Sequence, residues 1–194
     1  SEEQNILIET TRSFVKNELI QYEELLEKTN NLPKELYEEI KQKSREIGLY
    51  ACNMPVKYGG GGLNTFDLTL VEKELGHTSL ALAEIVWRPQ NILMACKGDL
   101  VDEYLKPATT GERKDCIAMT EPEAGSDLRG MKTNAVKSND DWIINGTKHF
   151  ISNAHISDFV VLFAVTGKDE KEKNLLSCFL VDLDLPGVEV AKGY

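Results

Sequence analysis

The feature that most limits the possible folds of this chain is a change in the spacing of its apolar residues near residue 114. Upstream, apolar residues recur three and four positions apart, as on one face of an amphipathic helix. Downstream, the apolar runs shorten to the length of strands, with turn residues between them. This order predicts an α+β fold: an N-terminal all-α helical domain over residues 1–114, followed by an antiparallel β domain over residues 115–194.

The sequence of the N-terminal part predicts several helices, most of them bounded by glycine or proline. Pro33 suits a first helical turn, and Gly48 and Gly76 suit helix ends. Pro89 is expected to kink or end a long apolar helix, and Pro107 to stop a short one before it. The helices are expected over about residues 7–26, 33–48, 65–75, from 79 onward, and 99–105.

The C-terminal part predicts strands. Asn145-Gly146 is a strong hairpin signal, and we expect it to join two strands, with Lys148, Phe150 and Ser152 on one face of the second. The nearly all-apolar run 158–165 is expected to be buried on both faces. The strands are expected over residues 116–120, 133–137, 142–144, 147–151, 158–165, 176–181 and 188–191.

Composition and charge exclude several classes of function. The net charge of −10 argues against nucleic acid and against anionic membranes as partners. No apolar run approaches the ~20 residues that span a bilayer, and the acidic N-terminus is unlike a signal or transit peptide. The four cysteines and three histidines lack the spacing of a zinc site or a disulfide framework, so we expect no metal.

Two glycine-containing loops are candidate ligand sites. Gly59–Gly62 has neither the lysine of a phosphate loop nor a strand before it, so we interpret it as a flexible connection. Ala124-Gly125-Ser126 follows a strand that Pro122 ends. Its small residues would allow close approach of a flat or charged ligand. The alternative is a plain turn in which Ser126 or Asp127 caps the backbone.

The hairpin region allows two interpretations as well. An aromatic ring at Phe150, two residues from the hydroxyl of Ser152, could cover a ring system and bond its heteroatom. The alternative is an ordinary core phenylalanine at the end of a hairpin.

Several segments in register resemble one family. They are the run from Met119 to Asp127, Lys132-Thr133 with Ala135, and the run from Asn145 to Ala154, preceded upstream by P…YGG…VEKELG over residues 55–76. In order and spacing these segments resemble the acyl-CoA dehydrogenases over nearly the whole chain. The resemblance implies an N-terminal helical domain, a central β domain and a C-terminal four-helix domain. The cofactor it implies is FAD.

The resemblance also implies which residues would meet the flavin and the substrate. Met119 and Thr120 would line the flavin ring with Ile117, mainly through the backbone of the strand. Gly125 and Ser126 would meet the phosphate-bearing tail, with Ser126 also near the thioester. Phe150 would pack on the ring, and Ile151 and Ser152 would lie beside it, with Ser152 reaching toward N5.

The activity implied is oxidation of the Cα–Cβ bond of an acyl-CoA, with electrons leaving through an electron-transfer flavoprotein. The glutamate base of the family lies in the C-terminal helices, which these 194 residues do not include. We therefore expect no catalytic residue here, and a role for Glu121 in holding the loop by hydrogen bonds. The chain would be one cut short, or one half of an enzyme split over two chains.

Further expectations depend on the same resemblance. It implies a homo-oligomer, dimer or tetramer, in the bacterial cytoplasm or the mitochondrial matrix. The alternatives are a related flavoenzyme that uses oxygen (an acyl-CoA oxidase, a nitroalkane oxidase or a monooxygenase) and a non-catalytic subunit. Arg88 falls near the expected acyl pocket, where it could pair with a polar substituent or be a surface or interface charge.

Overall fold

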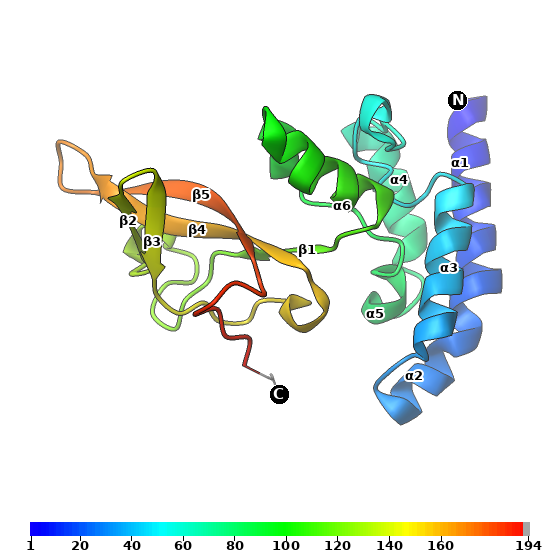
Figure 1. The fold of residues 1–194 in the computed structure, drawn as a ribbon. Coiled ribbons are helices and arrows are strands. Elements are labelled where there is room, and N and C mark those ends of the chain that lie inside the picture. The colour runs from blue at the N-terminus through cyan, green and yellow to red at the C-terminus, as the bar shows by residue number, and fades with distance from the viewer. Residues whose placement is uncertain (192–194) are drawn as a thin grey trace. The chain divides into compact units, whose positions relative to one another are not determined.

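The computed structural model describes residues 1–191 of the chain and divides it into two compact units, Ser1–Glu112 and Arg113–Tyr194 (Figure 1). The expected division lay between residues 114 and 115. The α+β class is confirmed, since helices fill the first unit and strands the second. No helix among residues 1–191 has the length and apolar character needed to cross a membrane.

The first unit contains helices and the loops that join them, and no strand among the residues described. Its helices are α1 (Glu2–Phe14), α2 (Glu23–Thr29), α3 (Lys34–Glu46), α4 (Thr65–Leu75), α5 (Leu80–Ala83) and α6 (Lys106–Thr110). Between α1 and α2 the chain stays helical through a wider π turn, Val15–Leu19, and a short 3₁₀ turn, Ile20–Tyr22. The expected continuous helix over 7–26 is therefore interrupted where Val15 and Leu19 enter the core.

The core of this unit collects apolar side chains from α1, α3, α4 and the segment after α5. An ion pair with one buried partner reinforces it: Glu74, 2% exposed, accepts from the guanidinium of Arg12, 53% exposed, through both carboxylate oxygens, at 3.0 and 3.1 Å. This bidentate contact joins α1 to α4. The buried apolar residues include Phe14, Leu19, Ile40, Leu49, Val71, Leu75, Leu82, Ile85 and Val86.

The long helix expected from Ser79 is wrong, because only Leu80–Ala83 is an α-helix there. The Trp87 carbonyl accepts from the Ala51 amide at 2.8 Å, and Arg88 pairs with Glu72 on α4. The chain is thus drawn away from a helical path. The apolar residues of this segment are buried because other elements surround it. A continuous apolar run of this kind cannot be told from a buried helix by its sequence pattern alone.

The stop expected before Pro107 is also wrong. A π turn over Val101–Leu105 leads directly into α6, and Pro107 lies in the first turn of that helix. Proline is common in the first turn of an α-helix, where its fixed φ suits the helix.

The glycine loop is a packed turn rather than a loose connection. The amides of Gly60, Gly61 and Gly62 donate to the carbonyls of Pro55, Ala51 and Met54, at 2.8–3.2 Å. A Cβ on Gly60 would lie 2.2 Å from the Met54 carbonyl oxygen. Glycine is therefore required here by close backbone contact.

The second unit holds a five-stranded sheet within the residues described: β1 (Asp115–Ala118), β2 (Asn134–Ser138), β3 (Asp141–Asn145), β4 (Phe159–Lys168) and β5 (Asn174–Asp182). Figure 1 shows β4 and β5 running side by side through this unit. β4 is central, pairing with β1, β2 and β5. The expected burial of the whole run 158–165 is met only in part: Phe159–Val161 and Ala164 are buried, Leu162 and Phe163 are partly exposed, and Asp158 is exposed.

The sheet is mixed, so the expectation of an antiparallel domain needs correction. β1 and β2 run parallel to β4, whereas the β2–β3 and β4–β5 pairs are antiparallel. The long connection between β1 and β4 contains the β2–β3 hairpin and returns the chain in its original direction. Parallel pairing requires a long crossover of this kind.

Three further strand predictions are corrected. The hairpin turn lies at Asn139-Asp140, with Asn139 at φ +56°, and not at Asn145-Gly146. The expected strands over 147–151 and 188–191 are irregular. Gly146 serves a close approach to Thr133 instead of a turn, since a Cβ there would lie 2.3 Å from the threonine hydroxyl.

Candidate functional site

The loop after β1 is the first part of the candidate site. The amide of Glu121 donates to the Ala124 carbonyl at 2.9 Å, and the Ala124 amide donates back to Glu121 at 3.2 Å. This tight turn places Gly125 and Ser126 on the surface, and a Cβ on Gly125 would meet nothing within 4 Å. Asp127 caps the Arg129 amide at 3.2 Å, so the turn is capped as one alternative expected, by Asp127.

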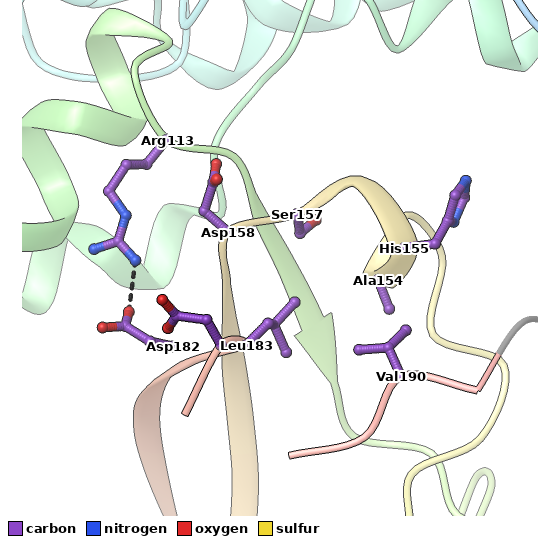
Figure 2. A pocket seen from close by; sticks show the side chains of 9 residues that line it. Arg113, Ala154, His155, Ser157, Asp158, Asp182, Leu183 and Val190 are labelled. Atoms are coloured by element: carbon purple, nitrogen blue, oxygen red, sulfur yellow. Dashed lines mark hydrogen bonds and ion pairs between the residues drawn. The ribbon is translucent and has the colours of Figure 1, made fainter. Parts of the chain in front are cut away.

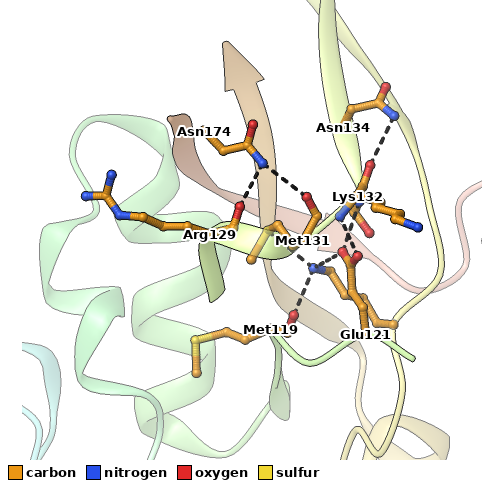
Figure 3. Close-up of polar contacts among 9 residues, drawn as sticks. Met119, Glu121, Arg129, Met131, Lys132, Asn134 and Asn174 are labelled. Atoms are coloured by element: carbon orange, nitrogen blue, oxygen red, sulfur yellow. Dashed lines mark hydrogen bonds and ion pairs between the residues drawn. The ribbon is translucent and has the colours of Figure 1, made fainter. Parts of the chain in front are cut away.

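A buried carboxylate anchors this loop. Glu121 is 6% exposed, and its two oxygens accept from the amides of Lys132 at 2.6 Å and Thr133 at 3.0 Å. Figure 3 shows the Glu121 side chain directed toward this stretch of backbone. Glu121 therefore ties the end of β1 to the start of β2, which confirms its expected role in holding the loop.

The Lys148 ammonium completes the anchor. Its Nζ donates to Glu121 Oε1 at 2.8 Å and to the Met119 carbonyl at 3.0 Å. The two side chains are only 9% and 4% exposed. Burial raises the pKa of Glu121, but the hydrogen bonds from Lys132, Lys148 and Thr133 outweigh it and lower the pKa to about 2. A carboxylate held in this way is unsuited to accept a substrate proton.

The segment after β3 lies directly beside the end of β1. The His149 amide donates to the Thr120 carbonyl at 2.9 Å. The carbonyls of Met119 and Thr120 are thus both occupied by the 148–149 segment. Since the C=O and N–H of a trans peptide point in opposite directions, the Thr120 amide points away from Lys148. A backbone donor on the side away from this anchor can bind a polar ring edge or a phosphate oxygen.

Lys148 and Phe150 do not lie on one face of a strand, although the sequence pattern predicted that they would. Lys148 points into the protein, while the Phe150 ring is 70% exposed and its backbone is left-handed, with φ +56°. Ile151 packs against the apolar cluster of Cys116, Ala118 and Val160. Phe150 is therefore not a core residue, which excludes that alternative.

The structure brings some of the eight predicted residues together and separates others. Hydrogen bonds place Met119 and Thr120 beside residues 148–149, and the Glu121–Ala124 turn holds Gly125 and Ser126 next to them. Ile117 alternates with Cys116 and Ala118 along β1, so its side chain lies on the face of the sheet opposite Ile151. Ser152 is exposed. No described hydrogen bond joins residues 125–126 directly to residues 150–152.

Arg88 is occupied by its own unit. Its guanidinium pairs with Glu72, with Nε–Oε1 at 2.7 Å, and donates to the carbonyls of Ala83, at 3.0 Å, and Val86. The side chain is only 17% exposed. It holds the segment after α5 against α4, a role that neither earlier interpretation of Arg88 included.

A hollow of about 560 Å³ lies at the other end of β1, and the sequence analysis did not identify it. Figure 2 shows Arg113, just before β1, facing Asp182 at the end of β5. Their N–O distance is 2.5 Å, and the guanidinium also lies 5.0 Å from the centre of the Phe159 ring. Phe159 and Asp182 are partners in the β4–β5 register. Arg113, which directly precedes β1, therefore contacts the start of β4 at Phe159 and the end of β5 at Asp182.

We expect Asp182→Asn to lower the free energy of unfolding of the β unit by about 1 kcal/mol. The Arg113–Asp182 ion pair is only partly exposed, so it contributes more stability than a fully exposed pair. Chemical denaturation at low and high salt measures the loss, which should shrink as salt screens the pair. Asp184→Asn, an exposed neighbour in the same hollow, is the control and should change stability by less than about 0.5 kcal/mol. Equal effects of the two substitutions would contradict a stabilising role for the Arg113–Asp182 ion pair.

Comparisons with known proteins agree with the resemblance. Residues 1–112 match the family profile described as acyl-CoA dehydrogenase, N-terminal domain, and residues 116–194 match the profile of the middle domain. The rat mitochondrial long-chain specific acyl-CoA dehydrogenase is 34% identical over 96% of this chain and 44% of its own length. The benzylmalonyl-CoA dehydrogenase of Aromatoleum aromaticum is 32% identical over 99% of this chain and 50% of its own.

A solved structure gives the same result. The glutaryl-CoA dehydrogenase of Mycobacterium smegmatis, in complex with FADH2, superposes with a TM-score of 0.82 at 27% identity, over 96% of this chain and 47% of that one. The chain thus spans about half the length of the relatives it matches. With both of its units matched by successive family domains, the chain belongs to the acyl-CoA dehydrogenase family.

Proposed function

We propose that this chain forms the N-terminal and middle domains of an FAD-dependent enzyme that oxidises an acyl-CoA thioester to the 2,3-enoyl-CoA. The observation that carries the proposal is the anchored loop after β1, with an exposed aromatic ring on the segment bound to it. Open small residues beside a solvent-facing ring suit a flat cofactor with a phosphate-bearing tail. Relatives of the same family, one of them with bound FADH2, support the same cofactor.

In this proposal the residues of the chain bind and orient. The strand end at Met119 and Thr120, with the backbone of Ile117, would lie along the flavin ring, and Gly125 and Ser126 would meet the phosphates. Phe150 would cover the ring, with Ile151 and Ser152 at its edge, and Ser126 would also approach the thioester. When bound, FAD supplies the acceptor for the hydride that leaves Cβ.

The base that removes the α proton is placed outside these two domains. Glu121 is the buried carboxylate of the loop after β1, and its oxygens are committed to Lys132, Thr133 and Lys148. We further propose that electrons leave through an electron-transfer flavoprotein and that the enzyme is a homo-oligomer. The location proposed is the bacterial cytoplasm or, in a eukaryote, the mitochondrial matrix.

The test uses the full-length protein, loaded with FAD and mixed anaerobically with acyl-CoA thioesters of increasing chain length. Bleaching of the flavin absorbance and appearance of the enoyl product are expected with at least one of them. Absence of bleaching across chain lengths and branched acyl groups would refute dehydrogenation. Oxygen consumption during aerobic turnover would instead identify an oxidase or monooxygenase.

A matched pair of variants tests the placement of the cofactor. Ser126→Ala is expected to weaken FAD binding about tenfold, because a hydrogen bond to a charged group contributes about 1.5–3 kcal/mol. Ser138→Ala, at the far end of β2, should bind FAD like the parent. Equal FAD dissociation constants for the two variants, measured by equilibrium titration, would argue against a phosphate contact at Ser126.

A further inference from the structure

The Phe150 ring is stacked on the imidazole of the residue before it. The ring centroids of His149 and Phe150 are 3.7 Å apart, with 25° between the ring planes. In an extended segment, consecutive side chains point to opposite sides. The left-handed backbone at Phe150, φ +56°, breaks that alternation and brings both rings to the same side.

This conformation is unfavourable for a residue other than glycine. Left-handed backbone costs about 1–2 kcal/mol for an L-amino acid, and an aromatic pair returns about 0.5–1.5 kcal/mol. Burial of the Phe150 ring does not offset the remaining cost of the left-handed backbone, because the ring is 70% exposed. Strained residues of this kind cluster at ligand sites. An exposed ring held in this conformation is therefore a candidate ligand contact.

The backbone beneath the pair is firmly held. The His149 amide donates to the Thr120 carbonyl at 2.9 Å, and the preceding Lys148 is bonded to both Glu121 and Met119. On the other side, Ile151 enters the apolar cluster below β1 and β4. The two rings thus project from a segment that is fixed on both sides of them.

We propose that His149 is a positioning residue whose imidazole backs one face of the Phe150 ring, so that the ring presents its other face to a flat ligand. Given the proposed function, on which this inference rests, that ligand is the isoalloxazine ring of FAD. His149 acts through Phe150 and not on the flavin itself. Its contribution is to hold the aromatic ring in one orientation before the cofactor binds.

The first test measures FAD affinity of the full-length protein by titration, together with the visible circular dichroism of the bound flavin. His149→Leu is expected to weaken binding about two- to tenfold, the range that corresponds to one aromatic pair, and to alter the dichroism. His149→Phe keeps a ring and should restore both within about twofold. The thermal midpoint of the flavin-free protein should fall by no more than a few degrees in His149→Leu, because one aromatic pair contributes only about 0.5–1.5 kcal/mol.

A double-mutant cycle tests whether His149 acts through Phe150. Phe150→Leu should weaken FAD binding at least as much as His149→Leu, and the double variant should lose nothing beyond Phe150→Leu. Additive losses would overturn the positioning role. So would a His149→Leu variant that binds like the parent, or a His149→Phe variant as weak as His149→Leu.

A measurement without flavin separates this inference from the proposed function. In the NMR spectrum of the flavin-free protein, the ring signals of His149, assigned by their absence in His149→Leu, should be shifted upfield by the Phe150 ring and should lose that shift in Phe150→Leu. Absence of the shift would overturn the stacked pair. If the shift is present but the parent does not bind FAD, the proposed function fails and the role of His149 toward flavin fails with it, while the pair itself stands.

Discussion

Replacing Lys148 by methionine is expected to lower the free energy of unfolding of the β unit by about 3–5 kcal/mol, the range for breaking a buried ion pair from one side. The substitution keeps the length of the side chain but removes the ammonium. Glu121 would remain charged and buried, with only its two backbone donors, and the Met119 carbonyl would lose its partner. The measurement is chemical denaturation monitored through the signals of this unit.

The chain offers a matched control in the same loop. Lys132 and Glu123 form an ion pair whose side chains are 72% and 69% exposed. Lys132→Met should therefore change stability by no more than about 1 kcal/mol, the usual limit for an exposed pair. The Lys132 amide, which Glu121 binds, is unaffected by this substitution. Similar losses for the two lysines would show that burial of Lys148 has been misassigned.

The same cluster predicts a pH dependence. The pKa of Glu121 is lowered to about 2 in the folded chain, against about 4.3 in an unfolded one. A carboxylate whose folded pKa is depressed stabilises the fold above the unfolded value, and this stability is lost as the pH falls toward the folded one. We expect a loss of about 3 kcal/mol between about pH 4.5 and 2. Glu121→Gln should remove this step of the titration, and an unchanged acid profile in that variant would contradict the assignment.

Much of the fold follows from local sequence chemistry. The helix predicted over residues 65–75 from the stop at Gly76 is observed as α4, and the structure adds that Asn64 caps its start. The errors occurred where distant contacts decide the conformation. The segment after α5 is apolar and yet irregular, because Ala51 and Glu72 bind it. Asn145-Gly146 has the chemistry of a hairpin turn, but Gly146 is needed for close contact with Thr133.

The candidate site could be predicted in part. Motif spacing identified the loop after β1 and the 148–152 segment, and the structure joins them through Lys148 and His149. The direction of each side chain could not be predicted, since a strand pattern puts Lys148 and Phe150 on one face. The positive φ at Phe150 reverses that relation, and no residue type at this position announces it. The role of His149 was missed for the same reason.

Gly146→Ala is expected to destabilise the β unit by about 3 kcal/mol, the upper end of the usual range for overpacking. A Cβ at this position would lie 2.3 Å from the Thr133 hydroxyl oxygen and 2.6 Å from its Cα. Thr133 cannot easily retreat: its amide is bonded to Glu121 at 3.0 Å, and its carbonyl accepts from the Val165 amide at 2.8 Å. The new methyl group must therefore displace either the start of β2 or the anchored loop.

Gly167→Ala is the control, because a Cβ there would meet nothing within 4 Å. It should leave the free energy of unfolding unchanged within about 0.5 kcal/mol. The two variants are compared by denaturant titration, and FAD affinity is measured for each. Because Thr133 and Lys148 both bind Glu121, the strain from Gly146→Ala should reach the loop at Gly125–Ser126 and weaken FAD binding as well. A Gly146→Ala variant as stable as Gly167→Ala would mean that β2 and the segment after β3 do not approach as closely as described.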